Sequence, residues 1–212
     1  MNEVKARISQ AAQELFLSEG VDGVSMRKIA DRVGVTATAL YRHFRDKEEI
    51  FGEIMNAGLT ILSEYLSPAL KGEDPYRRLT GLIDAYLRFA LEQPRYFDLA
   101  FLVPGAMAGI SEELERRNRA TFKLAVEQVA RCMEAGIFRR SDPIGTAIYL
   151  WSTAHGLVML QRTNRLGGDA AQFRKLYRSV IGRALDGLRE SPRAKARGPA
   201  AIRAAKRRRE GA

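Results

Sequence analysis

The chain has 212 residues, of which 46% are hydrophobic and 28% are charged, and its formal net charge is +10. A chain of this length buries roughly 70% of its unfolded surface, so one or two compact domains are expected. The single cysteine excludes an internal disulfide framework. Because no stretch approaches the roughly 20 uncharged apolar residues of a membrane span and residues 1–7 lack a signal-peptide pattern, we expect a cytoplasmic protein without membrane contact.

The first two predicted helices follow from apolar spacing. Ile8 to Phe16 carry one apolar face, and Gly20 ends that segment. Met26, Ile29, Ala30 and Val33 then repeat at helical spacing, preceded by Ser25 as an N-cap and followed by Gly34.

Two further helices complete the N-terminal third. Thr36 is placed to cap a third helix in which Leu40 and Phe44 point inward. Asp46, with Glu49 three residues later, resembles a capping box that opens a fourth helix. Four helices are therefore expected between residues 3 and 66.

The remaining helices are delimited by proline, glycine and capping residues. Their predicted ranges are 75–92, a short segment from Pro94, 111–135 capped by Ser111, 143–165 after Asp142, and 169–189 after Gly167 and Gly168. Because no strand pattern or internal repeat is visible, the prediction is an all-α fold of about nine helices. Cys132 lies among apolar residues, which favours a small core residue over a redox sensor.

The charge is unevenly distributed. Residues 1–50 hold eight Lys/Arg and eight Asp/Glu, residues 51–189 hold nineteen and fifteen, and residues 190–212 hold eight and two. The last segment has too few apolar residues for a core and is predicted to be a disordered basic tail.

Residues 25–44 have the proportions of a helix-turn-helix around the turn at Gly34 and Val35. Leu40 and Phe44 point inward, so the helix that begins after Thr36 presents Arg42 on its outward face, where it can bind guanine. The small side chains of Ala37, Thr38 and Ala39 allow close approach to thymine methyls. Four side chains suit phosphate oxygens: Ser25, Lys28, Tyr41 and Lys47. The alternative is that Tyr41 and His43 pack against the first helix and Arg42 is a solvated charge.

Five short motifs in residues 4–55 strongly resemble the DNA-binding signature of the TetR family. They are A-x-E-L-F at 12–16, M-R-K-I-A at 26–30, G-V at 34–35, L-Y-x-H-F at 40–44 and K-E-E-I at 47–50, together with Gly20. The resemblance implies that Arg27, Ala37, Thr38, Ala39, Arg42 and His43 approach bases, while Ser25, Thr36, Tyr41 and Lys47 hold phosphates. Because Ala37 and Ala39 carry no hydrogen-bonding group, shape readout is expected to contribute.

The resemblance also implies a DNA-binding domain at 1–62 and a ligand-binding and dimerisation domain at 63–189. The run from Trp151 to Gly156 and the segment 85–101 resemble a TetR subclass marked by W-x-x-x-H-G. The functional interpretation is a cavity for a largely hydrophobic effector, and the alternative is a packed core. The candidate lining residues are Tyr86, Phe89, Phe97, Phe101, Phe122, Trp151 and His155.

Helices 143–165 and 169–189 carry long apolar stripes. The resemblance implies that they pair with their symmetry mates in a four-helix bundle, which places two recognition helices about 34 Å apart on a palindrome. The prediction is therefore a homodimeric repressor of operator DNA, released by a small-molecule effector.

The runner-up hypothesis is an architectural DNA protein that uses the basic run at 206–209. An enzyme is disfavoured because the two histidines are far apart in the chain, and no metal-ligand spacing, nucleophile elbow or phosphate-binding glycine loop is present. No cofactor and no metal are expected.

Overall fold

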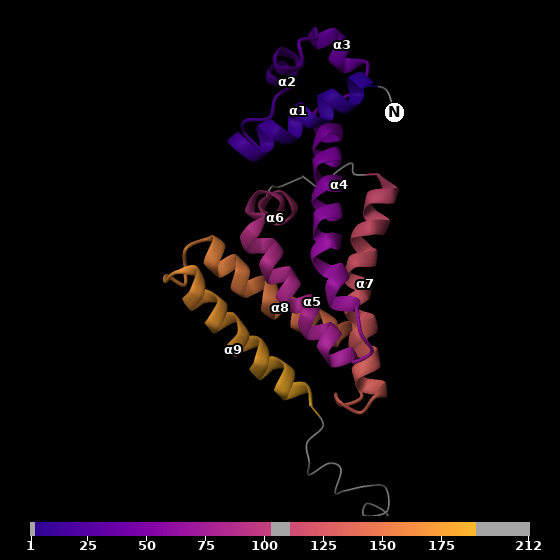
Figure 1. Cartoon of the computed structure of the whole chain (residues 1–212), viewed down its shortest axis with the longest axis vertical. Helices are drawn as coiled ribbons and strands as arrows, with labels where there is room; N and C mark the ends of the chain where they lie inside the picture. Colours follow the sequence, from indigo (N-terminus) through magenta and orange to yellow (C-terminus); the bar gives the residue numbers. More distant parts are fainter. Residues whose placement is uncertain (1–2, 103–110, 190–212) are drawn as a thin grey trace, which may run out of the picture. The chain divides into compact units, whose positions relative to one another are not determined.

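The computed structural model describes residues 3–102 and 111–189, and within them it is all-α, which confirms the predicted fold class (Figure 1). These residues form nine α-helices and one 3-10 turn. In chain order they are α1 (Glu3–Glu19), α2 (Met26–Val33), α3 (Ala37–Tyr41), α4 (Lys47–Leu66), η1 (Ser67–Leu70), α5 (Pro75–Glu92), α6 (Pro94–Phe101), α7 (Glu112–Glu134), α8 (Pro143–Arg162) and α9 (Ala170–Leu188).

Side-chain caps explain why the helices begin where they do. The Ser25 hydroxyl accepts from the Lys28 backbone N–H, and the Thr36 hydroxyl accepts from that of Ala39. The carboxylate of Asp142 accepts two backbone N–H groups of the first turn of α8, and Asp169 forms a full capping box with α9. Each cap satisfies backbone donors that have no partner inside the helix, so the predicted starting points are confirmed.

Two local details differ from the prediction. The α-helical part of α3 ends at Tyr41, and the chain then turns with the His43 N–H bonded to the Leu40 carbonyl at 2.9 Å. At the start of α4, the Asp46 carboxylate accepts from the backbone N–H of Glu49, as expected. The Glu49 carboxylate, however, accepts from the backbone N–H of Arg45 at 2.9 Å. The return bond therefore falls one residue earlier than in a capping box.

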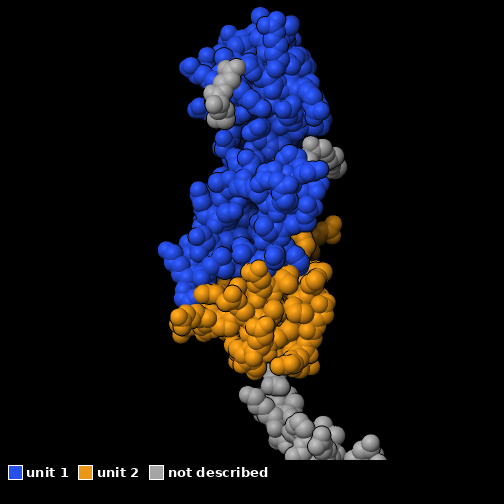
Figure 2. Space-filling view, turned by 90° about the vertical axis from the view of Figure 1, so that its right-hand side faces the viewer, with its two compact units in different colours: residues 1–72, 80–124 blue, residues 73–79, 125–212 orange. Residues whose placement is uncertain are grey.

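The chain forms two compact units, coloured separately in Figure 2. Unit 1 comprises residues 1–72 and 80–124, and unit 2 comprises residues 73–79 and 125–212. Unit 1 thus holds α1 to α4, η1, most of α5, α6 and the first half of α7. These units reflect local packing, and the functional boundary between residues 62 and 63 stays a prediction.

Each unit has its own apolar core. In unit 1 the side chains of Ile8, Phe16, Ile29, Leu40 and Phe44 are fully buried, where α1 packs against α2 and α4 and α2 packs against α3. Burying side chains of this size stabilises the fold by about 1.5–3 kcal/mol each.

In unit 2, Phe138, Val158, Phe173 and Tyr177 are buried together with Cys132. The core position predicted for Cys132 is confirmed. Burial, with a smaller contribution from Asp74, raises the pKa of its thiol to about 11.

None of the helices in the described ranges is long and apolar enough to cross a membrane. The predicted basic tail, residues 190–212, lies outside the described residues.

Candidate nucleic-acid interface

The turn between α2 and α3 depends on a glycine. Gly34 has a φ of 74°, a left-handed conformation that favours glycine, and its N–H bonds to the Ala30 carbonyl at 3.0 Å. The Val35 N–H reaches the same carbonyl at 3.0 Å. This closure ends α2 and directs α3 so that Leu40 is buried on one face.

The opposite face of α3 is open to solvent. Ala37, Thr38 and Arg42 are exposed, Tyr41 is 54% exposed, and His43 is half-buried. Ala39 is half-buried and Thr36 is exposed at the helix start. Six positions, Ala37, Thr38, Ala39, Tyr41, Arg42 and His43, are thus at least partly accessible, and we call them the α3 face; Arg27, the remaining predicted base-reading residue, lies on α2.

Two of the predicted phosphate-binding hydroxyls are already used as acceptors in caps. Ser25 caps α2 at 3.2 Å and Thr36 caps α3 at 3.1 Å. Because a hydroxyl also carries a proton, each remains able to donate to a phosphate oxygen while it caps its helix. Capping and phosphate binding are thus compatible at both positions.

The basic side chains near α3 differ in whether they already have partners within the protein. Arg27 is 93% exposed, with Asp31 at 4.0 Å. Lys47 donates to the Val21 carbonyl at 3.4 Å and lies over the Phe51 ring. The Lys28 ammonium is 2.6 Å from the Glu19 carboxylate, and this hydrogen bond lowers the pKa of Glu19. A phosphate must compete with Glu19 for Lys28.

Replacing Glu19 with Gln is therefore expected to strengthen DNA binding. Freeing Lys28 for one more phosphate makes the logarithmic salt dependence steeper by roughly 0.9. Fluorescence anisotropy with a labelled duplex across a salt series measures both quantities. Glu14→Gln is the matched control, because Glu14 lies on the same helix and pairs with Arg32. An equal gain in DNA affinity in both variants would mean that the gain comes from the change in net charge and not from the release of Lys28.

Three of the candidate effector residues lie together in unit 1. The Phe97 ring centroid is 6.0 Å from that of Tyr86 and 4.8 Å from that of Phe101, and we call these three the aromatic cluster. Phe89 packs instead against Tyr65, with centroids 5.9 Å apart, and Phe122 is half-buried. A role for these side chains in ligand binding stays a prediction.

The other two candidates belong to unit 2. The rings of Trp151 and His155 lie 5.6 Å apart on one face of α8, as their spacing predicts. Trp151 is 41% exposed, whereas burial lowers the pKa of His155. Burial therefore disfavours the charged form of His155.

Residues of α6 that the sequence did not single out bind the first helix. The Tyr96 ring packs on Phe16 with centroids 5.6 Å apart, and its hydroxyl oxygen accepts from the Gln13 side chain at 2.5 Å. Arg95 donates to the Ser18 carbonyl at 2.9 Å. We call these contacts the α1–α6 clamp.

Gly58 makes room for the clamp. A Cβ atom at this position would lie 2.9 Å from Tyr96 Cδ1, so only glycine lets α4 and Tyr96 approach this closely. A glycine inside a helix is a sequence signal of such an approach, but it does not single out this contact, because a Cβ atom at Gly52 of the same helix would have no neighbour within 4 Å.

The apolar stripes of the last two helices are only partly buried. Val158, Phe173 and Tyr177 form core, whereas large apolar side chains of both helices remain exposed in the single chain. The exposed set is Ile144, Ile148, Tyr149, Trp151, Leu160 and Leu176.

Two family models match this chain. The model described as bacterial regulatory proteins, tetR family, matches residues 8–54, and the one described as tetracyclin repressor-like, C-terminal domain, matches residues 79–184. The narrower W-x-x-x-H-G subclass stays a prediction.

The curated relatives are transcriptional regulators. The HTH-type regulator YobS of Bacillus subtilis is 32% identical over 95 residues, which are 45% of this chain and 50% of that protein. The chain therefore spans about half the length of the first relatives it matches. The HTH-type transcriptional repressor KstR2 of Mycobacterium tuberculosis is 26% identical over 144 residues, 66% of this chain and 71% of that protein.

Solved structures share the fold. The ketosteroid regulator KstR2 aligns with a TM-score of 0.61 at 22% identity, covering 90% of this chain and 97% of that one. AibR, crystallised with isovaleryl coenzyme A and operator DNA, aligns with a TM-score of 0.63 at 20% identity, covering 85% and 97%.

Proposed function

The chain belongs to the TetR family of bacterial regulatory proteins, and we propose that it is a homodimeric repressor, released from a palindromic operator by a hydrophobic effector. The observation that carries the proposal is the α3 face, an exposed surface next to a capped turn. Buried Leu40 fixes the helix, and the side chains of the α3 face remain exposed. A recognition helix must present its side chains in this way to contact bases in the major groove.

In this proposal Arg42 and His43 read base edges, and Ala37, Thr38 and Ala39 let the helix approach closely. Arg27 lies on α2, the helix before α3, and its high exposure supports a contact at the edge of the groove. Tyr41, Ser25, Thr36, Lys28 and Lys47 bind phosphates, which fixes the register on the duplex.

The exposed apolar side chains of α8 and α9 support dimerisation. The two helices pack against each other, so several large apolar side chains are exposed on neighbouring elements. Exposed apolar surface of this kind marks an interaction site, and a second copy covers it most simply through self-complementary contacts. A dimer presents two α3 faces to two half-sites, which is why the proposed operator is a palindrome.

The aromatic cluster supports a hydrophobic effector. Pockets for small molecules are lined mainly by apolar and aromatic side chains with few polar groups. AibR is described in complex with isovaleryl coenzyme A, whose acyl group is apolar, and KstR2 is named as a ketosteroid transcriptional regulator, which agrees with an effector that has an apolar part.

Helix α6 connects this cluster with the DNA-binding helices inside unit 1. Phe97 and Phe101 belong to the cluster, and the preceding residues Arg95 and Tyr96 form the α1–α6 clamp. An effector that moves Phe97 must also move the contacts of Tyr96 with α1. A ligand that favours one arrangement of α6 then shifts the population of DNA-binding states.

Removing the Tyr96 hydroxyl is expected to loosen α1. Tyr96→Phe keeps the ring against Phe16 but loses the hydrogen bond from Gln13, which costs about 1 kcal/mol of unfolding free energy. Hydrogen exchange of the α1 amides should become faster. Tyr65→Phe is the control, since the Tyr65 hydroxyl donates to Glu92 within the same unit without touching α1. Identical exchange in both variants would contradict a specific clamp.

Selection of bound sequences from a random duplex pool tests the proposed function. The purified full chain at moderate salt should enrich a palindrome whose half-site centres are about one helical turn, roughly 10 base pairs, apart or a multiple of it. Recovery of no preferred sequence would refute the operator-binding proposal.

A further inference from the structure

One peptide bond of the helix-turn-helix is held at both of its edges. It joins Val33, the last residue of α2, to Gly34, and its N–H bonds to the Ala30 carbonyl at 3.0 Å. Its carbonyl oxygen, on Val33, accepts from Nη2 of Arg7 in α1 at 2.7 Å. Because a peptide unit is planar, two bonds at opposite edges fix its orientation. Glycine alone would leave this point of the chain flexible, and the direction of α3 depends on it.

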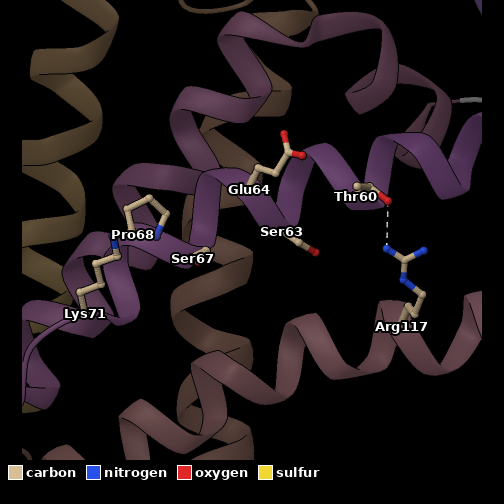
Figure 3. A pocket seen from close by; sticks show the side chains of 7 residues that line it. All are labelled: Thr60, Ser63, Glu64, Ser67, Pro68, Lys71 and Arg117. Atoms are coloured by element: carbon tan, nitrogen blue, oxygen red, sulfur yellow. Dashed lines mark hydrogen bonds between the residues drawn. The ribbon is translucent and has the colours of Figure 1, made fainter.

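The bond from Arg7 is made to the backbone, and this decides what it holds. Arg117 of α7 offers a contrast, because its guanidinium donates to the Thr60 hydroxyl of α4 at 3.0 Å (Figure 3). A hydroxyl can rotate on its own side chain, whereas a backbone carbonyl moves only with the chain. The carbonyls at the end of a helix also lack donors inside the helix and favour a positive charge. Arg7 therefore ties α1 to the path that the chain takes into α3.

A second contact from α1 holds the chain just after α3. The Lys5 ammonium lies 4.8 Å from the centroid of the Phe44 ring and 3.9 Å from the Glu49 carboxylate. Phe44 is fully buried and follows the last residue of α3 by three positions. A cation over an aromatic ring is attracted by the negative face of the ring. Lys5 thus contacts the chain after α3, as Arg7 contacts it before α3.

Helix α3 depends on such support because it has only five residues. A helix of this length is not stable by itself in water, so its orientation is set by the segments that it contacts. On α1, Lys5 and Arg7 lie on either side of the fully buried Ile8, at roughly 60° and 100° around the helix axis. The same buried seam of α1 is therefore flanked by the two side chains that reach the ends of the α3 segment.

We propose that Arg7 and Lys5 are positioning residues for DNA recognition, which set the orientation of the α3 face from α1. This inference rests on the proposed function, since it concerns how the α3 face meets operator DNA. A misplaced recognition helix loses its base contacts, whereas the attraction of basic groups to phosphates tolerates a change in geometry. Loss of either side chain should therefore lower binding to the operator more than binding to an arbitrary duplex.

The test compares Arg7→Met with the unsubstituted full chain. Methionine keeps much of the apolar stem but has no donor for the Val33 carbonyl. Without DNA, amide hydrogen exchange should become faster at Gly34 and Val35 and stay unchanged in the middle of α4. On the duplex enriched by selection, anisotropy should show an affinity lower by roughly fivefold, as loss of one hydrogen bond implies. Affinity for a shuffled duplex should change much less.

Two further variants separate position from charge. Arg32→Met is the matched control, because it removes the same charge from an exposed side chain of α2 that pairs with Glu14. Arg7→Lys keeps the charge and one donor, and should restore most of the preference for the operator over the shuffled duplex. Equal losses on both duplexes, with a salt dependence flatter by about 0.9, would make Arg7 a phosphate contact and overturn the proposal. Faster exchange throughout the chain with an unchanged preference would also overturn it.

Lys5→Met examines the other end of α3 and carries the test if Arg7→Met does not fold. Exchange should become faster at the His43 and Phe44 amides, which bond to the Leu40 carbonyl at 2.9 and 3.1 Å. Exchange at the level of the unsubstituted chain in both variants would overturn the inference, even where selection recovers an operator. Since exchange is measured without DNA, a failed selection leaves its result standing, and the two failures are distinguishable.

Discussion

Replacing Arg42 with Ala is expected to relax the base preference at one position of each half-site and to weaken operator binding by about 1–3 kcal/mol per contact. The reason is geometric: Arg42 is exposed on the α3 face, and a guanidinium matches the two acceptors on the major-groove edge of guanine. Repeating the duplex selection with the variant, followed by anisotropy on the enriched site, measures both changes.

Arg45→Ala provides the matched control for this experiment. Arg45 is exposed three residues further along the chain and lies 3.6 Å from the Glu49 carboxylate. Both substitutions remove one positive charge, so both should weaken binding to every sequence. Only Arg42→Ala should change the selected sequence. An unchanged preference in Arg42→Ala would assign this arginine to the phosphates or to solvent.

Tyr41→Phe adds a contrast within the same helix turn, because a phosphate contact carries no sequence information. It should lower affinity for all sequences by a similar factor.

Replacing Ile148 with Glu is expected to convert a dimer into a folded monomer. The side chain is 46% exposed in the single chain, so the substitution should change protomer stability by only about 0.5 kcal/mol. In a dimer joined through α8 and α9, the same change buries a carboxylate without a partner, which is strongly unfavourable. Sedimentation or light scattering shows the change in mass.

Ile148→Glu should also lower the affinity for operator DNA. A monomer binds one half-site and loses the avidity of two linked domains, a factor of about 100 or more. Leu17→Glu is the control, since Leu17 is an exposed apolar residue of α1 with a similar exposed fraction, 42%. A dimer that survives Ile148→Glu would place the interface elsewhere on the chain.

The helix boundaries were predictable because the signals that set them are local. Ser25, Thr36, Asp142 and Asp169 each bind backbone N–H groups two or three residues away. The apolar spacing of α1 to α4 likewise decides which face of each helix is buried. The same logic identified the α3 face, since burial of Leu40 leaves the opposite positions exposed.

Contacts between distant segments were not predictable from one sequence. The hydrogen bond between Gln13 and Tyr96 spans 83 residues, and those of Arg117 with Asn56 and Thr60 span 61 and 57. Such hydrogen bonds leave no periodic pattern in the sequence, because each depends on how two helices pack against each other. The pairing of Lys28 with Glu19 is closer in sequence but also depends on the path of the chain between α1 and α2.

The amino-acid sequence by itself determined the all-α fold, the positions of the helices, the family and the surface proposed to meet DNA, because capping and amphipathic periodicity act within a few residues. Only the tertiary structure decided which apolar side chains of α8 and α9 stay exposed, which basic groups near α3 already have partners, and which residues of α6 hold α1. These properties depend on packing between helices, and packing energies arise from side chains that the folded backbone brings together from distant parts of the chain.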